Sequence, residues 1–288
     1  MRHPDPNFGY AALSFVEKER LLARLQRKPG LNPMRRGAYV LDSYIDSLTW
    51  DEAVTRIAEW GAEHQSRYVT LCNVHSVVTA SQDPEFATVI NQADMAAPDG
   101  APIAWMLRKE GFPEQSRVNG PDLMWRYLGE AERRGQSVFF YGSGEATLGK
   151  LKTCLLANFP SLKIAGMVSP PFRTLTAEED AAYVQQINLS GASVVFVGLG
   201  CPKQEFWMAA HRGAIKAVML GVGAAFDYHA GTLRRAPNWM QQRGFEWLYR
   251  FANEPRRLAR RYIETNSLFV VKVIKRALFR QGAKDQKI

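Results

Sequence analysis

The stretch SVVFVGLG, residues 193–200, decides the fold, because a run of β-branched and aromatic residues ends there in two glycines. The same pattern recurs in SVFFYGSG at 137–144 and in AVMLGVG at 217–223. Strands that are apolar along their whole length are typical of a parallel sheet with helices on both faces. In such sheets, ligands bind at the carboxyl ends of the strands, where these glycine pairs stand.

Helical segments alternate with these strands. The capping box TWDE at 49–52 predicts a helix that runs to about His64. Further helices are expected at 76–92 with a break at Pro84, from Pro121 to about 134, after Gly144 to about 158, and at 176–188. Further strands are expected at 39–41, 68–71 and 163–168. We therefore predict an α/β fold: a Rossmann-like, mostly parallel sheet with helices on both faces, plus a helical, basic C-terminal appendage.

Three regions are expected along the chain: an N-terminal arm at 1–35 with a helix around Leu13–Arg27, an α/β core at 36–233, and the appendage at 234–288. Charge separates the last two. The whole chain carries a net charge of +9, yet 14 lysines and arginines and only four acidic residues follow residue 233. Such a segment attracts phosphate groups, whether on anionic lipid, on nucleic acid or on a diphosphate substrate.

The appendage contains a predicted amphipathic helix at 266–281, preceded by short helices at 237–242 and 245–253 and by a helix that restarts at 254–257 with Pro255 near its first turn. One side of its helical wheel carries Lys272, Lys275, Arg276 and Arg280, and the other side carries valines, isoleucine and leucine from 270 to 278. The apolar side would lie on an anionic membrane or pack against the core, and the sequence leaves both open.

Composition excludes several classes of protein. With 46% hydrophobic residues the chain can bury a full core, so wholesale disorder is not expected. Cys72, Cys154 and Cys201 lack zinc-site spacing and imply no disulfide framework. Residues 1–10 do not resemble a signal peptide, and no apolar stretch approaches the roughly 20 residues that span a bilayer. We therefore expect a cytoplasmic protein that is soluble or peripheral at a membrane.

Polar side chains follow the ends of two predicted strands. Asp99, in the turn PDGAP at 98–102, is a candidate general base, although an Asp-Gly pair commonly serves the turn itself. Asn73 offers donor and acceptor groups to a sugar or to uracil, and His75 titrates near neutral pH. Structural roles are the alternative for each of these residues.

The glycine turns are candidate diphosphate contacts. None matches the dinucleotide fingerprint, and the chain has no Walker A sequence. Three such turns at one sheet edge nevertheless favour a nucleotide site, and we select Gly142, Ser143 and Gly200. Gln204 opens the next helix, where the N-terminus favours a phosphate.

Arginines supply the expected counter-charge. Arg117 stands just before a Gly-Pro helix start, a position suited to contact an anion. Arg250, Arg257 and Arg260 share one face if their helix is continuous, and their forked donors would neutralise a leaving diphosphate. Pro255 interrupts that register, so their convergence requires a bend.

Together these segments resemble the WecG/TagA/CpsF family, glycosyltransferase family 26. The resemblance covers roughly Tyr39 to Tyr262 and rests on the number, order and spacing of short motifs. They are NVHSV (73–77), PDG (98–100) with Pro102, RVNGPDL (117–123), GLGCPKQE (198–205), GVGAAFD (221–227), RAP (235–237), EWLYR (246–250), EPRR (254–257) and RRY (260–262).

The resemblance implies an inverting, metal-independent transfer of a sugar from a UDP-sugar to a polyprenyl-diphosphate-linked acceptor, in cell-surface polysaccharide biosynthesis. The sugar would be of the N-acetylmannosamine, uronic acid or glucose type. Asp99 matches the family's base, and Arg117 and Gln204, with Asn73, match its substrate contacts. Arg250, Arg257 and Arg260 match an appendage that closes over the site at the membrane. The family often has Thr two positions before the Asn, where Leu71 stands here, so no direct role is assigned to Thr70.

Two alternative functions are weighed against this hypothesis. A nicotinamide-dependent Rossmann oxidoreductase would need the fingerprint that the chain lacks. A non-enzymatic basic adaptor would bind membranes or nucleic acid through the appendage. The transferase hypothesis predicts as partners a UDP-sugar, a lipid-linked glycan and the anionic inner face of the cell membrane, and no nucleic acid. The donor sugar, the acceptor glycan and the oligomeric state, including a homo-oligomer, stay open.

Overall fold

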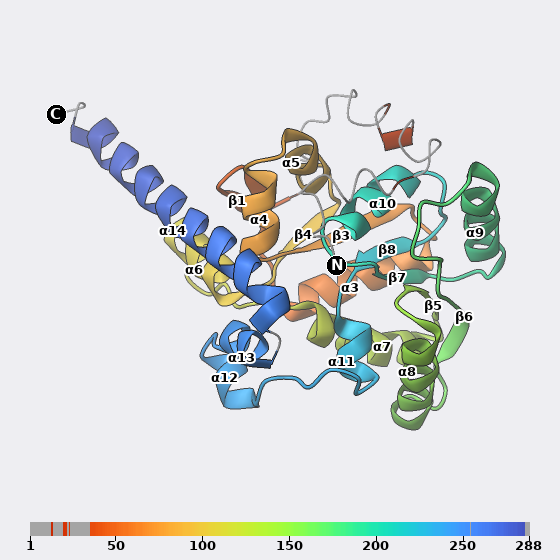
Figure 1. Cartoon of the computed structure of the whole chain (residues 1–288). Helices are drawn as coiled ribbons and strands as arrows, with labels where there is room; N and C mark the ends of the chain where they lie inside the picture. The colour runs from red at the N-terminus through yellow and green to blue at the C-terminus, as the bar shows by residue number, and fades with distance from the viewer. Residues whose placement is uncertain (1–12, 14–19, 22, 24–34, 254, 286–288) are drawn as a thin grey trace.

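The computed structural model describes residues 13, 20, 21, 23, 35–253 and 255–285. A six-stranded sheet runs through the molecule between two layers of helices (Figure 1). All its strands are parallel, in the order β4-β3-β8-β7-β5-β6. They are β3 (Arg67–Cys72), β4 (Met95–Pro98), β5 (Ser137–Gly142), β6 (Lys163–Val168), β7 (Val194–Gly198) and β8 (Val218–Gly221). The predicted α/β Rossmann-like fold is confirmed.

The helices of the core are α3 (Trp50–Ala62), α4 (Val74–Ala80), α5 (Pro84–Asn91), α6 (Ala101–Lys109), α7 (Gly120–Arg134), α8 (Glu145–Asn158), α9 (Ala177–Leu189), α10 (Lys203–His211) and α11 (Ala225–His229). One core lies between the sheet and α4, α5, α9 and α10, and a second lies between the sheet and α3, α7, α8 and α11 (Figure 1). Successive residues of a strand point to opposite faces. Phe139 therefore belongs to the first core and Phe140 to the second, which explains the continuous apolar run in β5.

The predicted elements are largely confirmed, some to the residue. β6 has the predicted bounds, and α3 begins behind the predicted capping box of Thr49 and Glu52. The predicted break at Pro84 is also confirmed. The carboxylate of Asp83 accepts hydrogen bonds from the backbone N–H groups of Glu85 and Phe86, which starts α5 as a separate helix.

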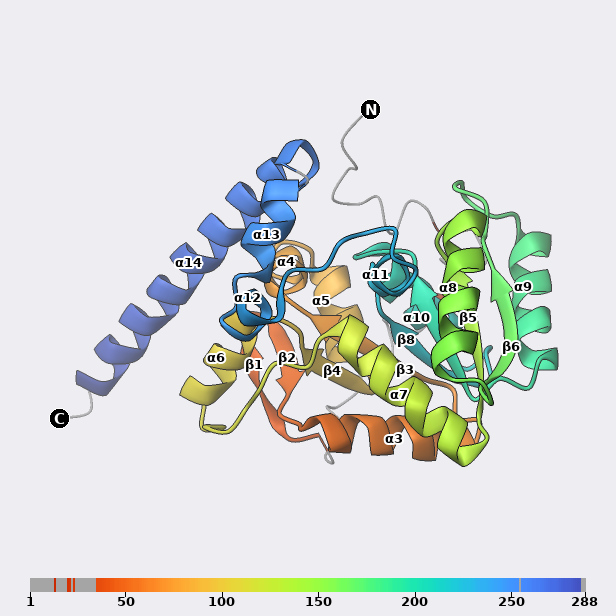
Figure 2. The same cartoon turned by 90° about the horizontal axis from the view of Figure 1, so that it is seen from below.

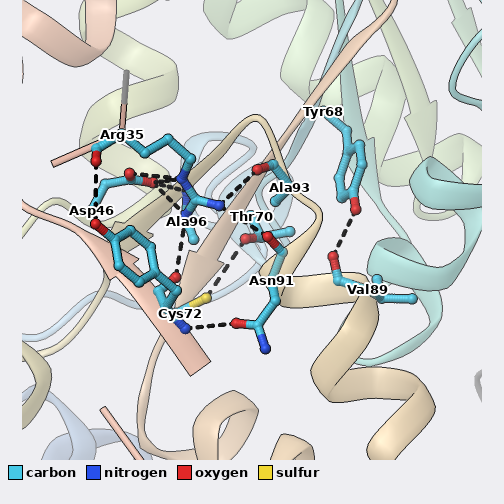
Figure 3. Close-up of polar contacts among 10 residues, drawn as sticks. Arg35, Asp46, Tyr68, Thr70, Cys72, Val89, Asn91, Ala93 and Ala96 are labelled. Atoms are coloured by element: carbon cyan, nitrogen blue, oxygen red, sulfur yellow. Dashed lines mark hydrogen bonds and ion pairs between the residues drawn. The ribbon is translucent and has the colours of Figure 1, made fainter. Parts of the chain in front are cut away.

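A small hairpin lies beside the sheet. Its strand β1 (Gly37–Val40) was predicted, but its partner β2 (Ser43–Asp46), which pairs with it antiparallel, was not. A buried ion pair closes the base of the hairpin, where the Arg35 Nη2 lies 2.8 Å from the Asp46 Oδ2 (Figure 3). The same Asp46 oxygen accepts a hydrogen bond of 2.6 Å from the backbone N–H of Ala96 in β4. This contact gives a hydrogen-bond partner to a backbone N–H on the outer edge of β4, the strand that leads to Asp99.

The appendage consists of α12 (Asn238–Gln242), α13 (Glu246–Asn253) and α14 (Pro255–Asp285). α14 is one helix, longer than the predicted segment at 266–281. It packs across α4 through Phe269, which is 7% exposed, and the Lys272 Nζ donates to the carbonyl oxygen of Ser81 at 3.1 Å. Its C-terminal end projects away from the core (Figures 1 and 2).

Much of the apolar side of α14 is exposed, although Val273 packs against the first core. Ile263, Val270, Ile274 and Leu278 are each more than half exposed, whereas Lys272 and Arg276 of the basic side contact the core. No helix among the described residues is long and apolar enough to cross a bilayer. The helix predicted around Leu13–Arg27 lies largely outside the described residues, and Leu13 and Leu21 are buried in the first core.

Candidate active site

The carboxyl ends of β3 and β4 bring Asn73 and Asp99 together. The backbone N–H of Asp99 donates to the carbonyl oxygen of Cys72, the last residue of β3, at 2.9 Å. The segment with Arg117 joins the same edge, because the N–H of Val118 donates to the carbonyl oxygen of Pro98 at 2.9 Å. Neighbouring parallel strands thus deliver Asn73 and Asp99 to one edge of the sheet, and the loop before α7 brings Arg117 to the same edge.

Asn73 caps α4 and flanks the turn after Asp99. Its side-chain oxygen accepts a hydrogen bond from the N–H of Ser76 at 3.2 Å. A side chain at Gly100 would place its Cβ 3.7 Å from the Cβ of Asn73, and the φ of +122° at Gly100 disfavours any side chain. No hydrogen bond of the Asn73 Nδ2 is found within the described part of the chain.

The protein around Asp99 changes its acidity. Burial raises the pKa of Asp99 to about 6 and outweighs the lowering effect of Arg117. Glu246 raises the pKa further, Arg250 lowers it, and Asp122 raises it slightly. A carboxylate with a pKa near 6 is ionised at neutral pH and still holds a proton better than an exposed Asp, as a general base requires.

Arg117 is bound to the appendage. Its Nη2 lies 2.6 Å from the Oε2 of Glu246, the first residue of α13, and both side chains are less than one-fifth exposed. A second ion pair lies beside it, between the Arg235 Nη2 and the Asp122 Oδ2 at 2.9 Å. Burial alone would raise the pKa of Asp122, but hydrogen bonds from Arg235 and Asn119 hold it below its usual range.

Sequence reasoning missed Glu246, Asp122 and Arg235 as site residues. All three stand in the short motifs quoted above, in EWLYR, RVNGPDL and RAP, so their positions carried a signal. Their pairing partners lie 129 and 113 residues away, and no local pattern in the sequence indicates such a contact.

Gln204 joins the loops that follow β7 and β8. Its Oε1 accepts hydrogen bonds from the N–H groups of Gly200 at 3.2 Å and Gly223 at 3.1 Å, and its Nε2 donates to Glu205. The side chain is almost completely buried. The structure therefore gives Gln204 a bracing role between the loops that follow β7 and β8, and its predicted contact with substrate stays a prediction.

The glycine turn after β5 lies against the end of β7. Gly142 has φ +121°, and a Cβ there would lie 2.7 Å from the backbone of Gly198. The N–H of Ser143 donates to the carbonyl oxygen of Gly198 at 3.2 Å. α8 and α10 start beside these turns without a side-chain cap, and in α10 the N–H of Gln204 already donates to the carbonyl oxygen of Gly200 at 2.9 Å.

The three predicted arginines of the appendage are placed differently. The guanidinium of Arg250 lies 5.8 Å from the ring centre of Tyr228 and acts electrostatically on Asp99. Arg257 and Arg260 belong to α14, but their side chains lie outside the described part of the structure. His75 is in the first turn of α4, and Thr70 is buried in β3, where its hydroxyl lies 3.6 Å from the Cys72 sulfur (Figure 3).

No group of three or more His, Cys, Asp or Glu side chains is placed to bind a metal ion within the described ranges. The charged side chains named above are arginines and carboxylates. Arg117 pairs with Glu246 and Arg235 with Asp122, while Arg250 acts electrostatically on Asp99. Such a mixture suits a substrate that carries both a hydroxyl to deprotonate and an anionic leaving group.

Comparison with known proteins identifies relatives of this arrangement. The sequence model of the glycosyl transferase WecG/TagA/CpsF family matches residues 38–283. An N-acetylglucosaminyldiphosphoundecaprenol N-acetyl-beta-D-mannosaminyltransferase of Bacillus spizizenii is 30% identical over 199 residues, which cover 69% of this chain and 76% of that protein. The protein of the same description from Bacillus subtilis is 29% identical over 193 residues, covering 67% and 73%.

Proposed function

The chain belongs to the WecG/TagA/CpsF family of glycosyl transferases, and from this we propose that it moves a sugar from a UDP-sugar to a polyprenyl-diphosphate-linked acceptor. The transfer inverts the anomeric carbon and needs no metal ion. The sugar is of the N-acetylmannosamine, uronic acid or glucose type, and the product enters cell-surface polysaccharide synthesis. The names of the two Bacillus relatives, which describe a lipid-diphosphate acceptor, support the acceptor class.

The environment of Asp99 is the observation that carries the proposal. Inversion in one displacement requires a base on the acceptor hydroxyl, on the face of the sugar opposite to the leaving UDP. Asp99 stands at the carboxyl edge of the sheet with a pKa of about 6 and with Arg117 and Arg250 nearby. The carboxylate accepts the hydroxyl proton while the acceptor oxygen attacks the anomeric carbon and the bond to UDP breaks.

The leaving diphosphate binds at the glycine turns. The backbone of Gly142, Ser143 and Gly200 approaches the phosphates, and the uncapped starts of α8 and α10 direct N–H groups at them. Arg250, Arg257 and Arg260 of the appendage neutralise the charge that develops on UDP. Fixed positive charge at a leaving group is worth several kcal/mol in a closed site, which is the task of the metal ion in other transferases.

Asn73 and Arg117 contact the sugars of donor and acceptor. Asn73 keeps its Nδ2 for this purpose while its Oδ1 caps α4. Gln204 contributes by holding the loops at Gly200 and Gly223 in place, in addition to any contact with the donor.

The appendage places the active site at a membrane. The exposed apolar side of α14 lies on the cytoplasmic face of the lipid bilayer, together with the exposed Trp239 and Trp247 of α12 and α13. Aromatic side chains favour the interface between lipid and water, and the basic residues of the appendage attract anionic headgroups. The lipid acceptor then reaches Asp99 from the surface on which the enzyme rests.

The test is turnover of a panel of UDP-sugars with a short-chain polyprenyl-diphosphate acceptor, in buffer with excess EDTA. Mass spectrometry of the lipid product identifies the sugar transferred. We expect one donor to give a product heavier by one sugar, at a rate unchanged by EDTA. Absence of any lipid product across the panel, or a rate abolished by EDTA, would contradict the proposal.

A further inference from the structure

Glu246 places a second carboxylate beside Asp99, and the proposed reaction gives it no role. It stands at the start of α13, and its Oε2 lies 2.6 Å from the Arg117 Nη2. The two residues are 129 positions apart, and the pair is largely shielded from solvent. It is a direct bond between the appendage and the segment that carries Arg117.

Arg117 lies near three carboxylates but is bonded to only one. It is the strongest of the groups that lower the pKa of Asp99, and it also acts on Asp122. Asp122 is already bound by Arg235, and Glu246 holds Arg117 directly. Within the described part of the chain, Asp99 forms no ion pair. Asp99 is therefore the carboxylate that Arg117 would bind if Glu246 were absent.

Such a rearrangement would weaken the base. A guanidinium in direct contact lowers the pKa of an aspartate by about 1–3 units, because it stabilises the ionised form. An aspartate that is held ionised by a cation accepts a proton from a hydroxyl less readily. The charged groups around Asp99 are Arg117, Arg250, Glu246 and Asp122, and Asp122 is in turn bonded to Arg235.

The appendage approaches the same turn by a second contact. A Cβ at Gly244, which has φ +77°, would lie 2.8 Å from the Cβ of Ala101, two residues after Asp99. The loop before α13 therefore rests on the start of α6, and this contact sets the position of Glu246. The same segment thus contacts the turn of Asp99 through Gly244 and Arg117 through Glu246.

We propose that Glu246 is a positioning residue that holds Arg117 away from Asp99, so that docking of the appendage leaves Asp99 as a free base. The inference rests on the proposed function of Asp99. When the appendage is undocked, Arg117 pairs with Asp99 and the base is quenched. A UDP-sugar bound in the open enzyme is then protected from attack by water, and the base becomes available only in the closed enzyme.

The first measurement is the pKa of Asp99 in the full-length protein, read from the carboxyl ¹³C shift of labelled aspartate and assigned by its loss in Asp99→Asn. The variants are Arg117→Gln, Glu246→Gln and the double variant. We expect Glu246→Gln to lower the pKa of Asp99 by at least about one unit. Glu264→Gln removes the same charge from the exposed surface of α14 and serves as the control, with no expected shift.

The double variant separates rearrangement from simple charge removal. If Arg117 moves to Asp99 when Glu246 is lost, Arg117→Gln raises the pKa of Asp99 more in the Glu246→Gln background than in the wild type. Additive effects of the two substitutions would mean that Arg117 does not move, and would overturn the proposal.

The second measurement is the pH profile of kcat/KM with the donor that the wild type uses. In Glu246→Gln we expect the acidic limb to move to lower pH and the plateau to fall about tenfold, with partial recovery in Glu246→Asp. A limb at the wild-type position would overturn the proposal. If the wild type transfers no sugar at all, the proposed function fails, while the ¹³C titration still decides the pairing of Arg117.

Discussion

Asp99 combines a place at the sheet edge with an altered acidity. The turn that carries it is held by hydrogen bonds of its own N–H to Cys72 and of Val118 to Pro98, so the carboxylate has a defined position. Burial raises its pKa to about 6, and Arg117 and Arg250 keep that value from rising further. A free carboxylate in such surroundings is poised for proton transfer near neutral pH.

This acidity predicts the pH dependence of the reaction. Below pH 6 Asp99 is protonated and cannot act as a base, so kcat/KM for transfer should fall about tenfold per pH unit. Above pH 6 the rate should reach a plateau. The profile is measured between pH 4.5 and 8.5 at saturating acceptor. A limb near pH 4, the usual range of an aspartate, would show that another group or an unperturbed Asp99 controls the rate.

Single residues were also where sequence reasoning reached its limit. The placement of Asp99 and Asn73 at one edge follows from the parallel sheet, which the apolar runs indicate, whereas Arg117 reaches that edge through the loop before α7. The ion pairs of Arg117 with Glu246 and of Arg235 with Asp122 could not be predicted from the sequence pattern, because they depend on how the appendage folds back on the core. Gln204 was selected for substrate, whereas its oxygen is occupied by two backbone N–H groups.

At the scale of elements, β4 is the strand on which the site depends. It lies at the edge of the sheet, and its free side is closed by the hairpin through Asp46 and Arg35. Arg35 also donates to the carbonyl oxygen of Ala93 at 2.9 Å, just before the strand begins (Figure 3). The ion pair thus fixes both the start of β4 and its outer edge.

Loss of Arg35 should therefore destabilise the protein strongly. Arg35→Met leaves the buried carboxylate of Asp46 without its cation, which costs about 3–5 kcal/mol in comparable buried pairs. Urea unfolding followed by circular dichroism measures the change. Arg133→Met removes an exposed arginine from its pair with Glu130 and should leave the midpoint unchanged. Equal midpoints for the two variants would contradict this account of β4.

The sequence indicated most helices and strands, but it did not indicate β2 or the full length of α14. β6 and the start of α3 were predicted closely, because apolar runs and capping boxes are local signals. β2 was missed, because SYID is too short to show a period and is defined by pairing with β1. α14 is one helix from Pro255, since a proline in the first turn needs no N–H donor and does not interrupt the helix.

At the scale of the whole molecule, the appendage has two different sides. The side toward the core carries Phe269, Lys272 and Arg276, and the opposite side carries exposed apolar residues. The sequence left packing and membrane binding as alternatives for this helix. The structure shows packing through one side, and the exposed apolar side stays a predicted membrane surface.

Membrane binding should depend on that exposed side. Replacing Ile274 and Leu278 by Glu removes two apolar side chains, each worth about 1.5–3 kcal/mol if fully buried in lipid. We expect flotation with vesicles of anionic lipid to fall at least about tenfold. Leu189→Glu changes a still more exposed leucine on α9, far from α14, and should leave flotation unchanged. Undiminished binding by the α14 variant would contradict the predicted orientation.

Asp99→Asn tests the central claim that Asp99 is the base of a UDP-sugar transferase. The rate of sugar transfer to the lipid acceptor is measured beside UDP binding by calorimetry. We predict a loss of about 100-fold or more in kcat with UDP affinity retained. Because the pKa of Asp99 is raised to about 6, the ionised carboxylate lowers the free energy of unfolding above pH 6. Asp99→Asn removes that cost, so the variant should unfold at the same or a higher urea concentration than the wild type at pH 7.5. Transfer at near wild-type rates by a folded, UDP-binding Asp99→Asn protein would contradict the account.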